Sequence, residues 1–154
     1  MAPIGSVVGR QVESFRIHLG AARSPNPYTP SEGLPVYDIE EMPVGGEVLL
    51  KLADVSLPDS DESWKGTWGE ELLERAKRCG TPAGRRCAGV MLARQREVPV
   101  SWRDFFLLLA GSAWEDADGR SFILCFAWQS GRWWLGHVWL HESFSHPFRL
   151  VLVV

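Results

Sequence analysis

The stretch that decides the fold is residues 121–142, SFILCFAWQSGRWWLGHVWLHE. It holds four of the eight tryptophans and two of the four histidines of the chain. Two apolar runs flank the tripeptide Gln129-Ser130-Gly131, and such runs around a short turn sequence are typical of paired strands. Gly131 can adopt the positive φ that a three-residue hairpin loop requires. We therefore predict an antiparallel hairpin formed by residues 121–128 and 132–141.

Pairing Trp128 with Arg132 across that loop assigns the side chains of the hairpin to two faces. One face is apolar, and we expect it to line the core: Phe122, Leu124, Phe126, Trp128, Trp134, Gly136, Val138 and Leu140. The other mixes aromatic rings, imidazoles and a thiol: Ile123, Cys125, Ala127, Trp133, Leu135, His137, Trp139 and His141. This second face is a second buried layer, a surface for a partner or ligand, or a reactive site. A shift of one residue in register would exchange the roles of the two faces.

A helix is predicted over residues 68–79. Thr67 and Glu70 have the spacing of a capping box, in which the hydroxyl and the carboxylate satisfy free backbone N–H groups at the start of a helix. Gly80 suits the position just after the helix, because it can adopt a left-handed conformation. The capping box thus indicates where the helix begins, and Gly80 indicates where it ends.

A second helix is predicted over residues 102–113, because Ser101 offers an N-cap and an apolar run follows. Residues 47–55 and 148–154 have the composition of strands. Residues 87–96 fit either a strand or a helix, since periodicity cannot decide so short a run. The expected fold class is α+β: a C-terminal antiparallel β-meander packed on one face by two helices.

Proline divides the chain into two parts. Six of the ten prolines lie in residues 1–43. Because proline fixes φ and lacks a backbone N–H donor, we expect this part to be a Pro-rich extended arm or loop region. Residues 44–154 are then expected to form a single globular domain.

The composition favours a soluble intracellular protein without a membrane span. No stretch approaches the roughly 18 consecutive apolar residues of a spanning helix, and the N-terminus lacks the pattern of a secretory signal. Three cysteines, Cys79, Cys87 and Cys125, are too few for a disulfide framework. The net charge of −3 predicts no class of partner by itself.

The charges are nevertheless unevenly distributed. Residues 38–74 carry eleven acidic side chains, whereas residues 75–103 carry eight basic side chains and one acidic one. The two blocks either neutralise each other or provide a surface for nucleic acid. The basic residues of that surface would be Arg75, Lys77, Arg78, Arg85, Arg86, Arg94 and Arg96.

Several catalytic and metal-binding patterns are incomplete. In the assumed register Cys125 lies diagonal to His137, and a thiol needs a nearby base to become a nucleophile. The segment 141–146 is H-E-x-x-x-H, one residue longer than the H-E-x-x-H motif that places two imidazoles on one helix face. We therefore expect no catalytic residue, no metal and no cofactor.

The sequence favours a small non-enzymatic interaction or accessory protein. Its partner is expected to be another protein, and a homo-oligomer is compatible with the sequence. The expected binding residues are Trp133, His137, Trp139, His141, Arg85 and Arg86. One alternative is a small hydrolase or metal-dependent enzyme that uses Cys125 or the cluster of His137, His141 and His146. A second is nucleic-acid binding through residues 75–96.

Overall fold

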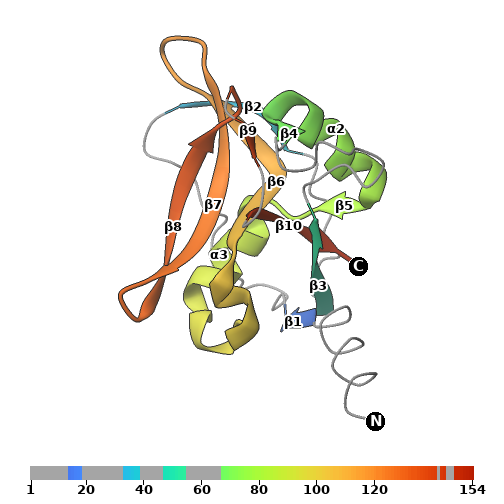
Figure 1. Cartoon of the computed structure of the whole chain (residues 1–154), viewed down its shortest axis with the longest axis vertical. Helices are drawn as coiled ribbons and strands as arrows, with labels where there is room; N and C mark the ends of the chain where they lie inside the picture. The colour runs from blue at the N-terminus through green and yellow to red at the C-terminus, as the bar shows by residue number, and fades with distance from the viewer. Residues whose placement is uncertain (1–13, 19–32, 39–46, 55–66, 142, 145–147) are drawn as a thin grey trace.

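The computed structural model describes residues 14–18, 33–38, 47–54, 67–141, 143–144 and 148–154 (Figure 1). The strands are β1 (Ser14–His18), β2 (Leu34–Asp38), β3 (Glu47–Asp54), β4 (Thr67–Trp68), β5 (Thr81–Pro82), β6 (Phe106–Glu115), β7 (Ser121–Gln129), β8 (Arg132–Trp139), β9 (Ser143–Phe144) and β10 (Phe148–Val153). The helices are α2 (Gly69–Cys79), α3 (Arg85–Ala93) and the 3-10 turns η2 (Gln95–Glu97) and η3 (Val100–Asp104).

Most of the described strands form one mixed sheet. Its main path runs β1-β3-β10-β6-β7-β8, while β2 also pairs with β6 and β5 with β10. Strands β6, β7 and β8 form an antiparallel meander. Strand β10 does not continue this meander beyond β8. It lies parallel to β6 and antiparallel to β3, so β8 is left at the end of the sheet. The expected α+β class is confirmed.

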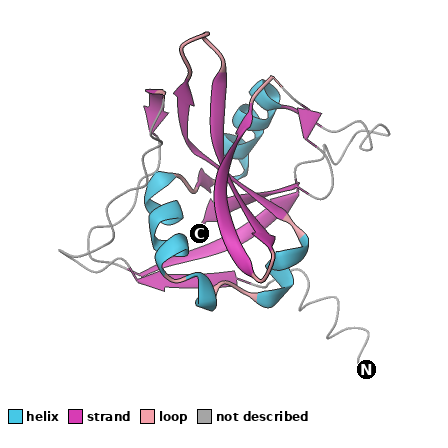
Figure 2. Ribbon diagram, turned by 90° about the vertical axis from the view of Figure 1, so that its left-hand side faces the viewer, coloured by secondary structure: helices cyan, strands magenta, loops and turns pink. Residues whose placement is uncertain are grey.

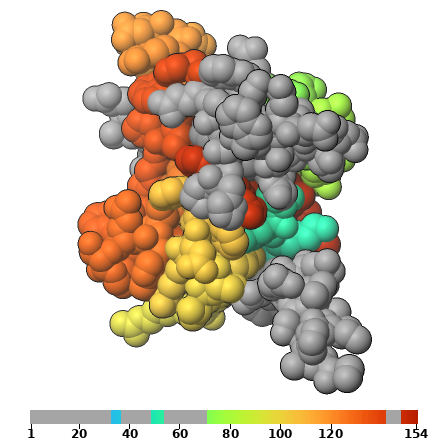
Figure 3. Space-filling model, viewed as in Figure 1, coloured from blue at the N-terminus to red at the C-terminus, as the bar shows by residue number. Residues whose placement is uncertain are grey.

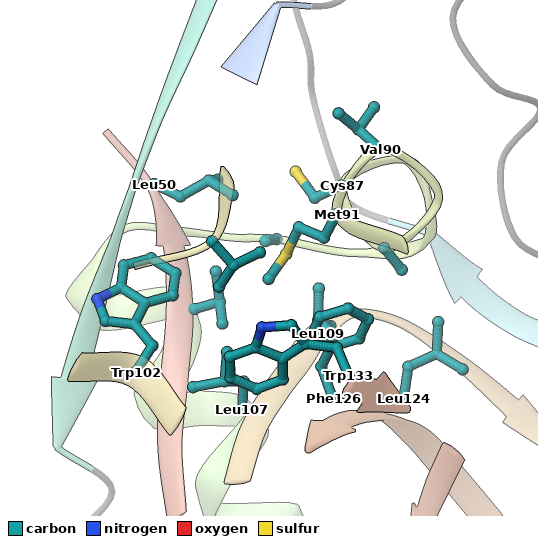
Figure 4. Packing of buried hydrophobic residues seen from close by; sticks show 14 of the residues in the cluster. Leu50, Cys87, Val90, Met91, Trp102, Leu107, Leu109, Leu124, Phe126 and Trp133 are labelled. Atoms are coloured by element: carbon teal, nitrogen blue, oxygen red, sulfur yellow. The ribbon is translucent and has the colours of Figure 1, made fainter. Parts of the chain in front are cut away.

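Two layers of apolar side chains lie on opposite faces of the sheet. The α3-side cluster includes Cys87, Ala88, Val90, Met91, Trp102, Leu107, Leu109, Phe126, Trp133 and Val151 (Figure 4). The α2-side cluster includes Leu72, Ala76, Leu108, Ala110, Ile123, Cys125, Leu140, Leu150 and Leu152. Because side chains alternate along a strand, Leu108 and Leu109 enter different clusters. Both helices pack on the sheet, but on its two faces and not on one (Figure 2).

The expected helix over residues 102–113 is wrong. A short 3-10 turn, η3, ends at Asp104, and the strand β6 follows. Eight consecutive residues of β6 are buried, because helices cover both faces of the sheet at this central strand. Continuous apolar runs are typical of such strands and resemble buried helices in sequence. The second helix is α3, which overlaps the segment that the sequence left undecided.

The hairpin is confirmed, but its register differs by one residue from the prediction. Gln129 pairs with Arg132, and Trp128 pairs with Trp133. The loop is therefore only Ser130 and Gly131, with φ of 52° and 80°. Positive φ at both loop residues is the signature of a type I′ turn, whose twist matches that of the flanking strands. Because of this shift, the odd-numbered side chains of β8 lie on the same face as the even-numbered side chains of β7, and not on the opposite face as predicted.

The N-terminal part contributes two strands to the sheet. β1 pairs with β3, and β2 pairs with the second half of β6. The rest of the expected Pro-rich arm lies outside the described residues. The expected helix over residues 68–79 is confirmed as α2, but the side chains of the proposed capping box, Thr67 and Glu70, are not described. No helix within the described ranges is long and apolar enough to cross a membrane.

Candidate functional site

The register shift places Trp133 in the core. Its side chain has no exposed surface and stacks on Phe126, with ring centroids 5.0 Å apart and an interplanar angle of 15°. Trp128 meets the same indole edge to face at 5.7 Å. A fully buried side chain cannot contact a partner in this conformation, so Trp133 contributes to packing between the hairpin and α3 (Figure 4).

The other three residues expected from this face lie in one row at the C-terminal end of β8 and just after it. His137 is exposed, and its ring centroid lies 5.2 Å from that of Trp139 and 4.8 Å from that of Phe122. Trp139 is half-buried and lies 6.4 Å from the exposed His141. We call His137, Trp139 and His141 the imidazole-indole row. It presents two exposed imidazoles beside one partly exposed indole.

A turn between β6 and β7 holds a cation over this row. Asp116 accepts hydrogen bonds from the backbone N–H of Arg120 at 2.8 Å and of Asp118 at 2.9 Å. These bonds, the one from Arg120 above all, lower the pKa of the Asp116 carboxyl. The same carboxylate binds the Arg120 guanidinium at 3.0 Å. That guanidinium lies 4.6 Å from the Trp139 ring centroid, so the turn fixes a cation–π contact at the edge of the row.

Strand β8 also carries an open backbone edge. In a hairpin with a two-residue loop, the residues that flank the loop exchange both backbone hydrogen bonds. The even-numbered residues of β8 therefore direct their backbone N–H and C=O groups toward β7. The odd-numbered residues direct theirs away from β7, toward the outer side of the strand. The outward N–H of Trp133 is satisfied by the side-chain oxygen of Gln95 at 3.2 Å. Within the described part of the chain, the outward groups of Leu135, His137 and Trp139 have no such partner.

An arginine-rich hollow lies at the opposite end of β8, beside the hairpin turn. It has a volume of about 740 Å³ and is lined by Leu92, Ala93, Arg94, Gln95, Arg96, Glu97, Arg103, Trp128, Gly131 and Arg132. We call it the arginine hollow. The end of α3, η2 and η3 border it on one side and the hairpin tip on the other, and these segments lie side by side in Figures 1 and 3. Four guanidinium groups and one carboxylate thus share one opening.

The fold divides the expected basic segment. Arg75, which is buried, and Arg78, which is exposed, belong to α2 on one face of the sheet. Arg85 and Arg86 begin α3 on the other face, and the Arg85 N–H binds Ser112 Oγ at 3.1 Å. The arginine hollow instead joins the last two arginines of the segment to Arg103 and Arg132. The sequence could not reveal this grouping, because it depends on where the hairpin tip packs.

The structure separates the residues of the proposed thiol pair. Cys125 lies opposite Gly136 and belongs to the α2-side cluster, whereas His137 lies on the α3 side. Burial raises the pKa of the Cys125 thiol to about 12, so the thiol is protonated at neutral pH. His146, which belongs to the cluster that the alternative enzyme would use, lies outside the described residues. Among those described, no group of three His, Cys, Asp or Glu side chains could hold a metal ion.

Comparisons with known proteins give no guide to function. No known protein family matches the chain, and searches of curated proteins and of solved structures find no significant match. The features of the molecule that can indicate a function are the imidazole-indole row, the open edge of β8 and the arginine hollow.

Proposed function

We propose that the protein is a non-enzymatic interaction protein that binds an extended segment of another protein along the edge of β8. The observation that carries this proposal is the open run of outward backbone groups at Leu135, His137 and Trp139. An extended peptide can add to such an edge by backbone hydrogen bonds, while side-chain contacts give selectivity.

The composition of β8 supports this use of its edge. Sheet edges are commonly protected by proline, lysine or a bulge, because an unprotected edge pairs with other strands. β8 is eight residues long, contains neither proline nor lysine, and pairs with β7 without a break in register. One outward N–H, that of Trp133, is capped by Gln95. This cap lies at Trp133, so the outward groups of Leu135 and of the two row residues in β8, His137 and Trp139, are left open within the described residues.

Side chains along the open part can supply the selectivity. His137 is exposed, Trp139 is half-buried and Gly136 is exposed. Among the described residues, no atom lies within 4 Å of the position that a Cβ of Gly136 would occupy, so they leave the other face of β8 open there as well. Indole and imidazole rings combine apolar area with a polar atom, and tryptophan is a common anchor at protein interfaces.

The test combines capture with hydrogen exchange. His137→Pro removes one outward N–H and leaves the hydrogen bonds to β7 intact, a placement of proline that edge strands tolerate. We expect this variant to bind a captured partner about tenfold more weakly, as the loss of about 1.4 kcal/mol would produce. In the wild-type complex, the amides of Leu135, His137 and Trp139 are expected to exchange more slowly.

Two matched variants control this experiment. His137→Ala changes the side chain but keeps the backbone N–H, and Arg78→Ala changes an exposed residue of α2 on the opposite face. A folded His137→Pro variant that binds the partner as tightly as Arg78→Ala would contradict the proposal. A complex that leaves the three amides unprotected would contradict it too. A homodimer protected at these amides would mean that a second copy occupies the edge.

A further inference from the structure

We propose that the arginine hollow binds a small ligand bearing one or more phosphate groups. The inference is independent of strand addition at β8, because it concerns side chains at the other end of that strand. Its basis is the grouping of Arg94, Arg96, Arg103 and Arg132 around one opening. The size of the hollow, about 740 Å³, lies within the range of pockets that hold small molecules.

The charges of the hollow are not balanced by its own residues. Arg94 follows α3 at its C-terminal end, where a cation is favourable, and its Nε lies 3.9 Å from a carboxylate oxygen of Glu97. Glu97 is the one acidic residue among the described residues of the lining. Within the described residues, Arg96, Arg103 and Arg132 have no carboxylate within ion-pair distance. Three guanidinium groups are therefore available to an anion.

Arg103 is held in place before any ligand binds. Its guanidinium carbon lies 3.7 Å from the centroid of the Trp128 ring, and both residues line the hollow. The Nε atom of Arg103 is buried and has no hydrogen-bond partner in the described part of the protein. A buried polar group without a partner is destabilising. The contact with Trp128 fixes the plane of the guanidinium group at the wall of the hollow.

The rim at the hairpin tip is also ordered by specific contacts. The guanidinium carbon of Arg132 lies 3.9 Å from the Trp134 ring centroid, and Trp134 Nε1 donates a hydrogen bond to the Gln129 carbonyl at 2.9 Å. Gln95, from η2, joins the two sides of the hollow through its bond to the Trp133 N–H. Fixed guanidinium groups lose less side-chain entropy on binding than free ones.

The chemistry of arginine selects phosphate over a carboxylate. A carboxylate offers two oxygens and one charge, which one guanidinium fork can satisfy. A phosphate offers more oxygens and about two charges at neutral pH. Several forks can therefore bind one phosphate or a diphosphate at once. Arg96, Arg103 and Arg132, which form no ion pair with the described residues, can together bind the several oxygens of a phosphate or diphosphate.

The test measures binding of inorganic pyrophosphate by calorimetry, with ATP and citrate as further probes. We expect saturable binding of pyrophosphate and of ATP, weakened by added salt. Citrate, which carries carboxylates alone, is expected to bind about tenfold more weakly, and an effect of that size corresponds to roughly one charge-assisted hydrogen bond. Citrate binding as tight as that of pyrophosphate would overturn the choice of phosphate.

Variants localise the site. Arg96→Met removes an exposed arginine of the hollow, and Arg103→Lys keeps the charge but loses the planar fork. Each is expected to weaken pyrophosphate binding about tenfold, whereas Arg78→Met, which removes the same charge from α2, should leave it unchanged. Equal weakening by Arg78→Met would show a diffuse charge effect and overturn the proposal. Binding of a single-stranded oligonucleotide without any binding of pyrophosphate would overturn it in favour of a polymer.

Discussion

Gly111 marks the closest approach of β6 to the segment between β5 and α3. Its N–H donates to the Ala83 carbonyl at 2.9 Å. A Cβ at this position would lie 2.5 Å from the Pro82 carbonyl oxygen and 2.9 Å from the Gly84 nitrogen. Both neighbours are backbone atoms, which cannot move away as the end of a side chain can. The glycine therefore lets α3 begin directly against the central strand.

Gly111→Ala is expected to lower the free energy of unfolding by about 1–3 kcal/mol, the usual cost of overpacking a core. Gly136→Ala is the matched control, because no atom of the described residues lies within 4 Å of its added Cβ. We expect the control to change stability by less than about 0.5 kcal/mol or to increase it slightly. Urea unfolding of both variants checks this. Equal stability of the two variants would contradict the close contact.

At the scale of single elements, the turn of the hairpin determines the register of β7 and β8 and therefore which side chains share a face. Its existence, and the positive φ of Gly131, followed from the sequence. The register did not, because a three-residue and a two-residue loop both place Gly131 at a positive φ and differ in the conformations of Gln129 and Ser130. A positive φ at a residue other than glycine costs about 1–2 kcal/mol. The sequence therefore favoured the three-residue loop, in which Ser130 keeps a negative φ. The twist of the strands favours the type I′ turn nevertheless.

Ser130→Asn is expected to stabilise the protein by about 0.5–1 kcal/mol, because asparagine tolerates positive φ and Asn-Gly is the preferred type I′ pair. Thermal and urea unfolding measure the change. Gly131→Ala should act in the opposite direction, since it places a Cβ at a φ of 80°. A loss of stability in Ser130→Asn would contradict the two-residue loop.

One of the two predicted helices was confirmed, whereas the other proved to be a strand. α2 followed from its terminal residues, and it lies within one residue of the expected range. The apolar run that includes Phe106 and Leu109 belongs to a strand, because both faces of β6 are covered by layers contributed from distant parts of the chain. Burial on both faces removes the alternation that normally identifies a strand. Local sequence carries no signal of that coverage.

At the scale of the whole molecule, the candidate sites depend on contacts that the sequence does not encode locally. The aromatic and imidazole residues were predictable as a group, and His137, Trp139 and His141 remain accessible. The arginine hollow was not, since its members come from the end of α3, two 3-10 turns and the hairpin tip. Only the packing of α3 against one face of the sheet brings these segments together.

The two apolar clusters are joined by β6, and this predicts how the whole domain unfolds. Leu108 and Leu109 are both fully buried, but the first contacts the α2-side cluster and the second the α3-side cluster. Truncation of either to alanine is expected to lower the free energy of unfolding by about 2–5 kcal/mol. Because both clusters need the same strand, unfolding should remain a single transition in each variant.

Tryptophan fluorescence and far-UV circular dichroism distinguish a single unfolding transition from separate unfolding of the two clusters. Among the described residues, the tryptophans of the two clusters all belong to the α3 side: Trp102, Trp114, Trp128, Trp133 and Trp139. Leu108→Ala removes volume from the cluster that lacks them. If the domain is cooperative, its fluorescence midpoint in urea falls together with its dichroism midpoint. A dichroism midpoint that falls while fluorescence stays at the wild-type value would mean that the α2 layer unfolds separately, and that β6 does not couple the two faces.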